Sequence, residues 1–100
     1  MSILSEILDE EYVRLNNTIA SYEAMVADLP KGSIRKKTIG GRQYDYLQWR
    51  EKDRVRSKYI KPEDKDSLIE QIERRRQYEK EIKALKKSRK EFVRVIGKEL

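Results

Sequence analysis

The chain has 100 residues, 42% of them charged and 37% hydrophobic, and its formal net charge is +6. A chain of this size and composition has little apolar material for a core, so we expect one domain built on long, solvated helices. The sequence has no cysteine and no histidine, which excludes disulfides, thiolate chemistry, the usual general base and the commonest zinc ligand. We therefore expect no metal, no cofactor and no enzymatic activity.

No apolar run approaches the roughly 20 residues that a membrane-spanning helix needs. The first residues, MSILSEILDEEY, also lack the basic start and the unbroken apolar segment of a secretory signal. We expect a cytoplasmic protein that does not contact a membrane.

The charge is distributed unevenly along the chain. Residues 1–30 hold one basic and six acidic side chains, residues 31–61 hold eleven basic and three acidic, and residues 62–100 hold twelve basic and nine acidic. The middle third is therefore the positive pole of the molecule, which indicates an anionic partner.

The first 29 residues carry the pattern of an amphipathic helix. Apolar residues recur at alternating steps of four and three: Leu8, Tyr12, Leu15, Ile19, Tyr22, Val26 and Leu29. This heptad seam predicts a helix over residues 2–29, with Ser2 as its N-cap and Pro30 ending it. A second edge of this helix carries small residues that would let another helix approach closely: Ala20, Ala24 and Ala27.

Residues 33–60 predict a three-stranded antiparallel sheet. Its first turn is Gly40-Gly41, because two glycines suit the positive φ values of a two-residue type I′ hairpin turn. This turn fixes the pairing of the first two strands: Ile39 with Arg42, Lys37 with Tyr44, Arg35 with Tyr46, and Ile34 with Leu47.

The second turn of the sheet is less strongly marked. We prefer a three-residue loop, Glu51-Lys52-Asp53, which pairs Trp49 with Val55 and groups the apolar residues on one face. Moving this loop by one residue would flip the third strand and put Arg56 beside Trp49.

The preferred register sorts the side chains of the sheet into two faces. The apolar face carries Ile34, Leu47, Trp49, Val55 and Tyr59. The other face is basic, has two tyrosines in its middle and ends at Ile39 and Ile60. Its basic and aromatic residues are Arg35, Lys37, Arg42, Tyr44, Tyr46, Arg56 and Lys58.

Residues 62–97 predict a second long helix, which begins at Pro62 and whose apolar seam is interrupted at Arg74-Arg75-Arg76. The predicted fold class is α+β, a single domain over residues 1–100. Its two long amphipathic helices form an antiparallel coiled-coil hairpin with the three-stranded antiparallel sheet at the tip. One two-helix seam buries too little apolar surface to offset the ordering of about 60 helical residues, so we expect a homodimer.

The segment between the helices contains three motifs: Leu29-Pro30-Lys31-Gly32-Ser33, Tyr44-Asp45-Tyr46-Leu47-Gln48-Trp49-Arg50 and Val55-Arg56-Ser57-Lys58-Tyr59-Ile60. Together with the Lys/Glu-rich closing helix, these motifs resemble an uncharacterised family of small bacterial and archaeal proteins and domains, often encoded near mobile genetic elements. The resemblance implies the helix–sheet–helix architecture and implies no activity. A looser likeness to the three-stranded DNA-binding arms of phage-type integrases rests on fold analogy.

The basic face with its tyrosines favours a nucleic-acid-binding accessory protein. Arginine and lysine neutralise phosphates, and tyrosine rings stack on exposed bases. The predicted contact residues for DNA or RNA are Arg35, Lys37, Arg42, Tyr44, Tyr46, Arg56 and Lys58. The same face is also compatible with a merely solvated surface.

The alternative function is a protein-binding adaptor or inhibitor that acts through its helical surfaces on an acidic protein partner. An antitoxin or an anti-defence protein of a mobile element would be of this kind.

Overall fold

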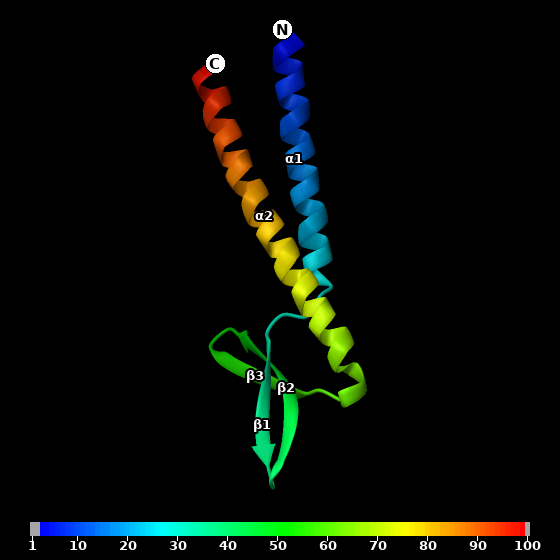
Figure 1. Ribbon diagram of the computed structural model, residues 1–100. Helices are drawn as coiled ribbons and strands as arrows, with labels where there is room; N and C mark the ends of the chain where they lie inside the picture. Colours follow the sequence, from blue (N-terminus) through cyan, green and yellow to red (C-terminus); the bar gives the residue numbers. More distant parts are fainter. Residues whose placement is uncertain (1–2, 100) are drawn as a thin grey trace. The chain divides into compact units, whose positions relative to one another are not determined.

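The computed structural model describes residues 3–99, so the predicted N-cap Ser2 lies outside the described residues. The elements follow in the order α1 (Ile3–Ala27), β1 (Ser33–Ile39), β2 (Arg42–Glu51), β3 (Arg54–Tyr59), a 3₁₀ turn (Pro62–Asp64) and α2 (Lys65–Glu99) (Figure 1). The fold is α+β, as predicted, and the strands form an antiparallel sheet in the order β1-β2-β3. No helix in the described part of the chain is long and apolar enough to cross a bilayer.

The helix bounds differ slightly from those that the sequence predicts. α1 ends at Ala27 rather than at Leu29, because Pro30 disfavours helical geometry in the residue before it. The second helix starts with one 3₁₀ turn at Pro62, and its regular α-helical part begins at Lys65. Pro62 therefore opens the element, as its fixed φ and missing N–H allow.

The chain divides into two compact units. The helical unit consists of the residues up to Asp28 and the residues from Gln77 onward, and the sheet unit consists of Leu29–Arg76. α2 begins in the sheet unit and ends in the helical unit. Each unit has buried apolar residues of its own, so each is described separately.

In the helical unit, α1 lies beside the later part of α2 and runs in the opposite direction. Near the start of α1, Tyr12 stacks on Phe92, with ring centroids 6.5 Å apart. Near its end, Tyr22 contacts Tyr78, with centroids 5.5 Å apart. The partners on α2 come earlier in the sequence as those on α1 come later, so the pair is antiparallel.

Burial along α1 is deepest in its middle. Ile19 is 2% exposed and Leu15 is 9% exposed, whereas Ile7 is 54% and Ile3 is 76% exposed. Figure 1 shows the ribbons of α1 and the later part of α2 diverging toward the chain ends. The predicted seam is therefore buried at Leu15 and Ile19 in its centre and partly buried at Leu8, while Ile3 and Ile7 lie outside the seam.

The exposed side of α1 carries an ion pair between Arg14 and Glu11. The guanidinium donates hydrogen bonds to the carboxylate, and it holds the pKa of Glu11 below its usual value. The two side chains are largely exposed and lie one turn apart on a single helix, so the pair belongs to the helix surface.

The register of the first hairpin is as predicted. Ile39 opposes Arg42, Lys37 opposes Tyr44, Arg35 opposes Tyr46, and Ile34 opposes Leu47. Gly40 and Gly41 have φ values of 60° and 82°, which glycine adopts without a steric penalty. The glycine turn therefore decides which side chains of β1 and β2 share a face.

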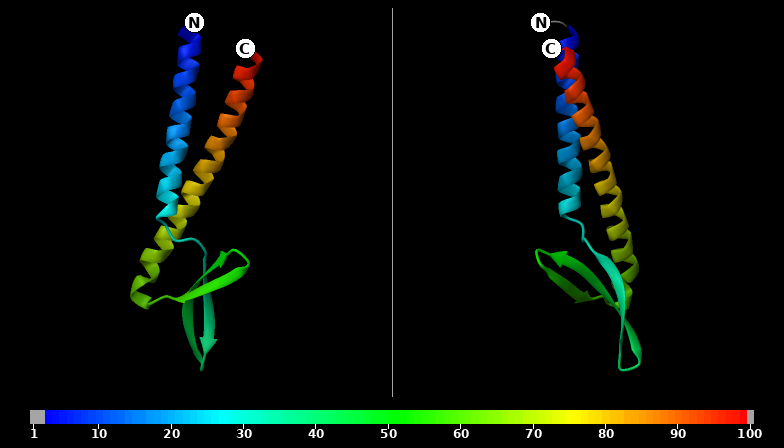
Figure 2. Two further views of the ribbon diagram at one scale, coloured as in Figure 1. Left: turned by 180° about the vertical axis from the view of Figure 1, so that it is seen from behind. Right: turned by 90° about the vertical axis from the view of Figure 1, so that its left-hand side faces the viewer.

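The predicted register of the second hairpin is wrong by one residue. Glu51 is paired with Arg54, so the turn has two residues, Lys52-Asp53, and Trp49 opposes Arg56 instead of Val55. Lys52 takes a φ of 56°, a left-handed conformation that lysine rarely adopts. The turn and both hairpins are visible from two further sides in Figure 2, with the two turns at opposite ends of β2.

This shift moves every side chain of β3 to the face opposite the predicted one. Val55 is 62% exposed and Tyr59 is 46% exposed, and both lie on the face that carries Tyr44 and Tyr46. Arg56 and Lys58 lie on the other face, opposite Trp49 and Leu47. Neither cation is therefore a neighbour of the two predicted tyrosines.

The core of the sheet unit is small and lies between one face of the sheet and the start of α2. Its buried residues are Leu47, Ile60 and Ile72, and the partly buried residues packed against them are Ile34, Trp49 and Leu68. Ile60, which we expected at the end of the basic face, is 5% exposed and belongs to this core. Its N–H donates to the carbonyl oxygen of Asp45 at 2.9 Å, which continues the ladder beyond β3.

The loop that leads from α1 into β1 is held by two arginines of α2. Arg75 Nη1 donates to the carbonyl oxygen of Leu29, and Arg76 Nη2 donates to that of Gly32 at 3.2 Å. Gly32 has a φ of 120°, and a Cβ there would lie 2.4 Å from the carbonyl oxygen of Gln48. This backbone approach requires glycine in the LPKGS motif.

Candidate functional site

The outer face of the sheet carries a cluster of three tyrosines. Tyr44 and Tyr46 project from β2, and Tyr59 comes from β3 directly opposite Tyr46. The ring of Tyr59 meets that of Tyr44 at a centroid distance of 6.1 Å and that of Tyr46 at 5.8 Å, both edge to face. Aromatic rings favour this geometry because the positive edge of one ring meets the negative face of the next.

Cations surround the tyrosines on the same face. By register, Arg35 opposes Tyr46, Lys37 opposes Tyr44, Arg42 opposes Ile39, and Arg50 opposes Val55. We call this surface the tyrosine face. Its polar and aromatic residues are Ser33, Arg35, Lys37, Arg42, Tyr44, Tyr46, Gln48, Arg50, Ser57 and Tyr59.

The acids of the strands lie on the opposite face. Asp45 opposes Lys36 and forms an ion pair with Lys65 at 3.1 Å. Glu51 forms an ion pair with Arg56 at 3.4 Å. The tyrosine face is therefore free of carboxylates within its strands, and its positive charge is not neutralised locally.

Lys37 reaches across the whole width of the sheet. From β1, its Nζ lies 4.6 Å from the centroid of the Tyr46 ring on β2 and donates to Ser57 Oγ on β3 at 3.2 Å. An ammonium over an exposed aromatic ring contributes about 0.5–1 kcal/mol. Lys37 therefore covers one face of the Tyr46 ring, while Tyr59 stays 46% exposed.

The structure brings five of the seven predicted contact residues onto one face: Arg35, Lys37, Arg42, Tyr44 and Tyr46. Arg56 and Lys58 lie on the opposite face because β3 is paired one residue away from the predicted register. The same error hid Tyr59, which completes the aromatic cluster. A two-residue turn at Lys52-Asp53 places Tyr59 on this face, and the sequence carries no local signal for that turn.

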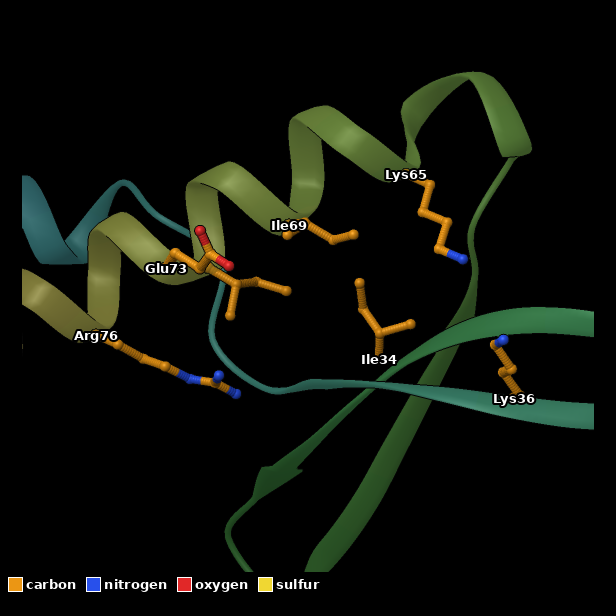
Figure 3. A pocket seen from close by; sticks show the side chains of 7 residues that line it. Ile34, Lys36, Lys65, Ile69, Glu73 and Arg76 are labelled. Carbon is orange, nitrogen blue, oxygen red and sulfur yellow. The ribbon is translucent and has the colours of Figure 1, made fainter.

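A pocket of about 330 Å³ lies on the other side of the sheet unit, between β1 and the first turns of α2. Ile34, Ile69 and Ile72 give it an apolar lining, and its charged residues are Lys36, Lys65, Glu73 and Arg76. Figure 3 shows Ile34 and Ile69 pointing toward one another, with Lys36 and Arg76 at opposite ends of the pocket.

The arginine run at residues 74–76, which interrupts the apolar seam of the second helix, has partners within the sheet unit. Arg74 pairs with Glu70 at 3.3 Å on the same helix. Arg75 and Arg76 donate to the carbonyl groups of Leu29 and Gly32. These contacts stabilise the loop before β1, so the run is part of the scaffold behind the sheet.

Residues 4–70 match the model of a protein family described as a domain of unknown function, DUF6788. The chain belongs to this family. The DUF6788 match covers most of α1, the whole sheet and the start of α2, so all three tyrosines lie within it. No curated protein and no solved structure matches the chain.

Proposed function

We propose that this DUF6788 protein is a non-enzymatic nucleic-acid-binding accessory protein and that the tyrosine face makes the contact. The observation that carries the proposal is the cluster of Tyr44, Tyr46 and Tyr59, flanked by arginine and lysine side chains, with the carboxylates of the strands on the opposite face. Cations next to exposed aromatic rings are the combination that binds single-stranded DNA or RNA.

Each residue type on the tyrosine face has a role in this proposal. Arg35, Lys37 and Arg42 neutralise phosphates, and these contacts position the strand. Tyr59 offers exposed ring surface for stacking on an unpaired base. Lys37 leaves the Tyr46 ring for a phosphate when the strand arrives, which frees a second stacking surface.

We also propose that the two helices form an antiparallel coiled-coil hairpin that presents the sheet at its tip, and that the protein acts in the cytoplasm. The antiparallel contacts of Tyr12 with Phe92 and Tyr22 with Tyr78 support the hairpin. The resemblance to proteins encoded near mobile elements would place the nucleic-acid partner in the biology of such an element.

A homodimer along α1 is part of the same proposal. The alanine edge of α1 is exposed, and the exposed Val13 lies on the same side of the helix at about 100° per residue. A second copy of α1 would bury this surface. Light scattering at micromolar concentration tests it: Ala24→Glu should give a monomer, while Ala84→Glu on the exposed side of α2 should not. A wild-type protein that is already a stable monomer would overturn the dimer.

The decisive experiment on function uses two matched charge reversals. The first variant is Arg35→Glu with Arg42→Glu on the tyrosine face, and the control is Arg56→Glu with Lys58→Glu on the opposite face of the sheet. Both change the net charge equally, and all four side chains are exposed. Labelled single-stranded and duplex oligonucleotides are titrated against each variant at two salt concentrations.

The first variant should lose about tenfold more affinity than the control, because it removes two phosphate contacts as well as net charge. Tyr59→Ala should weaken single-strand binding by about 1–3 kcal/mol and affect duplex binding less, since stacking needs an unpaired base. Equal losses in the two charge-reversal variants would rule out the tyrosine face. No binding by the wild type at low salt would rule out the function.

The second candidate function is a protein-binding adaptor or inhibitor with an acidic partner. The pocket favours it, because its apolar lining of Ile34, Ile69 and Ile72 is bordered by three cations and one carboxylate. An apolar side chain flanked by acids would fit this chemistry. Pull-down from the native host, with and without nuclease, separates the candidates. A protein partner that resists nuclease and is lost with Ile69→Arg would favour the adaptor.

A further inference from the structure

The later part of α2 carries a row of five cations that the proposed function does not use. Lys80, Lys83, Lys87, Lys90 and Arg94 follow one another at steps of three, four, three and four, and all five are exposed. At about 100° per residue, these steps keep all five within an arc of about 80° on the helix surface. The row, which we call the cationic stripe, is about 21 Å long at 1.5 Å per residue.

The stripe lies on the side of α2 that faces away from α1. The opposite side of the helix holds the contacts with α1, which include the stacking of Phe92 on Tyr12 and the hydrogen bond from Arg89 to Asn16 Oδ1 at 2.9 Å. Tyr78, Leu85 and Phe92, which face α1, are partly buried, whereas the stripe is open to solvent. The stripe is therefore accessible to a ligand without any change in the helix pair.

The cations of the stripe repel one another, and the nearest acids, Glu79 and Glu91, lie along its two edges and not within the row. Neighbours in the stripe are three or four residues apart, and like charges at this spacing destabilise a helix. Within the described residues, no ion pair uses any of these five side chains, and the pair between Lys86 and Glu23 at 3.9 Å lies beside the stripe. An anionic ligand along the helix would turn this repulsion into attraction.

The composition of the stripe also restricts the class of ligand. Two shallow hollows border it, of about 590 and 270 Å³, and their residues are almost all lysine and arginine, with Ala84 and Glu91 as the exceptions. A protein partner would need an apolar anchor at the centre of its contact. A membrane would need a free apolar helix face, and the apolar face of α2 packs on α1. A regular row of cations without an anchor suits a regularly charged polymer.

We propose that the cationic stripe binds the phosphodiester backbone of a nucleic acid, as a second contact independent of the tyrosine face. The inference rests on the proposed function in one respect, because it assumes that the ligand is a nucleic acid. It adds that the strand or duplex is held along α2 by phosphate contacts, which position the ligand but do not select its sequence. The stripe lies beyond residues 4–70, which the DUF6788 model matches, so the family match does not bear on it.

The test is a triple substitution with a matched control. The stripe variant is Lys83→Gln, Lys87→Gln and Lys90→Gln, and the control is Lys31→Gln, Lys52→Gln and Lys61→Gln, which removes three exposed lysines from the sheet unit. Affinity for a duplex and for a single strand is measured by anisotropy over a series of salt concentrations. Circular dichroism shows whether each variant keeps its helices, and relief of repulsion should leave the stripe variant at least as stable as the wild type.

The stripe variant should lower the slope of log affinity against log salt by about 2–3 for the duplex, since each lost phosphate contact removes about 0.9. The control should leave this slope within about 1 of the wild-type value. A slope that matches the control would overturn the stripe while leaving the tyrosine face as the binding site.

Comparison with the tyrosine-face variant separates the two proposals. If Arg35→Glu with Arg42→Glu keeps wild-type affinity and the stripe variant loses it, the stripe is supported as a binding site and the tyrosine face is ruled out. If both variants lose affinity, both contacts stand. If the wild type binds no oligonucleotide at low salt, both proposals are wrong.

Discussion

The two hairpins of the sheet share β2, and both have two-residue turns, but different residues adopt the positive φ that each turn requires. The first turn has glycine at both central positions, with φ of 60° and 82°. The second turn also has two residues, but it holds Lys52 at a φ of 56°. Glycine adopts this region freely, whereas a residue with a Cβ is strained there by about 1–2 kcal/mol. The first turn therefore stabilises the register of the first hairpin, whereas the strain at Lys52 destabilises the register of the second.

The second hairpin must therefore be fixed at its other end. There Ile60 is 5% exposed in the core, and its N–H donates to the carbonyl oxygen of Asp45. The first hairpin is also held at its open end, because the backbone at Gly32 packs closely against the carbonyl oxygen of Gln48. A register is therefore set either by the turn or by the packing beyond the strands. Substitutions at the turn and at the open end test both contributions in each hairpin.

The largest effect is expected from Gly32→Ala at the open end of the first hairpin. The new Cβ would lie 2.4 Å from the carbonyl oxygen of Gln48 and 3.1 Å from Trp49 Cβ, at a φ of 120°. Backbone strain and overpacking together should cost about 3–5 kcal/mol. Urea unfolding followed by Trp49 fluorescence measures this loss, because Trp49 is the sole tryptophan and lies in the sheet unit.

Gly97→Ala is the control for this substitution. A Cβ at Gly97 on α2 would meet no atom within 4 Å, so the change should be neutral or slightly stabilising. A similarly small effect for Gly32→Ala would show that the backbone does not approach Gln48 this closely in solution.

Ile60→Ala should have the next largest effect, at the open end of the second hairpin. Truncating a buried isoleucine costs about 2–4 kcal/mol because it leaves a cavity. The paired measurement is Val55→Ala, which should cost less than about 0.5 kcal/mol because Val55 is 62% exposed. Val55 distinguishes the two registers directly: a loss above about 2 kcal/mol would place its side chain against Trp49 and would restore the three-residue loop.

The pattern of these residues explains how much of the sheet the sequence could predict. The two glycines at Gly40-Gly41 indicate a turn with positive φ values, and this turn predicts the pairing of β1 with β2. The residues Lys52-Asp53 do not indicate a turn with a positive φ. The predicted second register groups Val55 with Trp49, and this grouping assumes a strand with one buried side. All six residues of β3 are exposed, so the pattern within the strand does not reveal its register, and the buried residue that fixes it, Ile60, lies beyond the strand.

The candidate site and the loop contacts show the same limit. The residues contributed by β1 and β2 were predicted together because one correct turn places them all. Tyr59 was missed, and Arg56 and Lys58 were misplaced, by the single shift in β3. The contacts of Arg75 and Arg76 with the loop carbonyls span more than 40 residues, and no local pattern encodes such a partnership. Periodicity revealed the helices but not how far their apolar seam stays buried.

A smaller loss is expected from Gly41→Ala in the first turn. No atom lies within 4 Å of a Cβ built there, so the cost is backbone strain alone, about 1 kcal/mol. Gly40→Asn should cost less, because asparagine tolerates the left-handed region. Thermal unfolding of the two variants side by side measures the difference. A loss at position 41 as large as that of Gly32→Ala would indicate a contact that the turn does not show.

The smallest effect, and the one of opposite sign, is expected from Lys52→Gly in the second turn. Glycine removes the strain at φ 56°, but it also loosens the unfolded chain, so the net gain should be about 0.5 kcal/mol. Asp53→Gly is the matched control: Asp53 is not among the residues with positive φ, so the substitution brings the entropic cost without the relief and should destabilise the protein. A gain in stability from Lys52→Gly together with a loss from Asp53→Gly would confirm that the second turn destabilises the register of its hairpin. Loss at both positions would mean that Lys52 is not strained, and the contrast between the two hairpins would then have to come from their open ends alone.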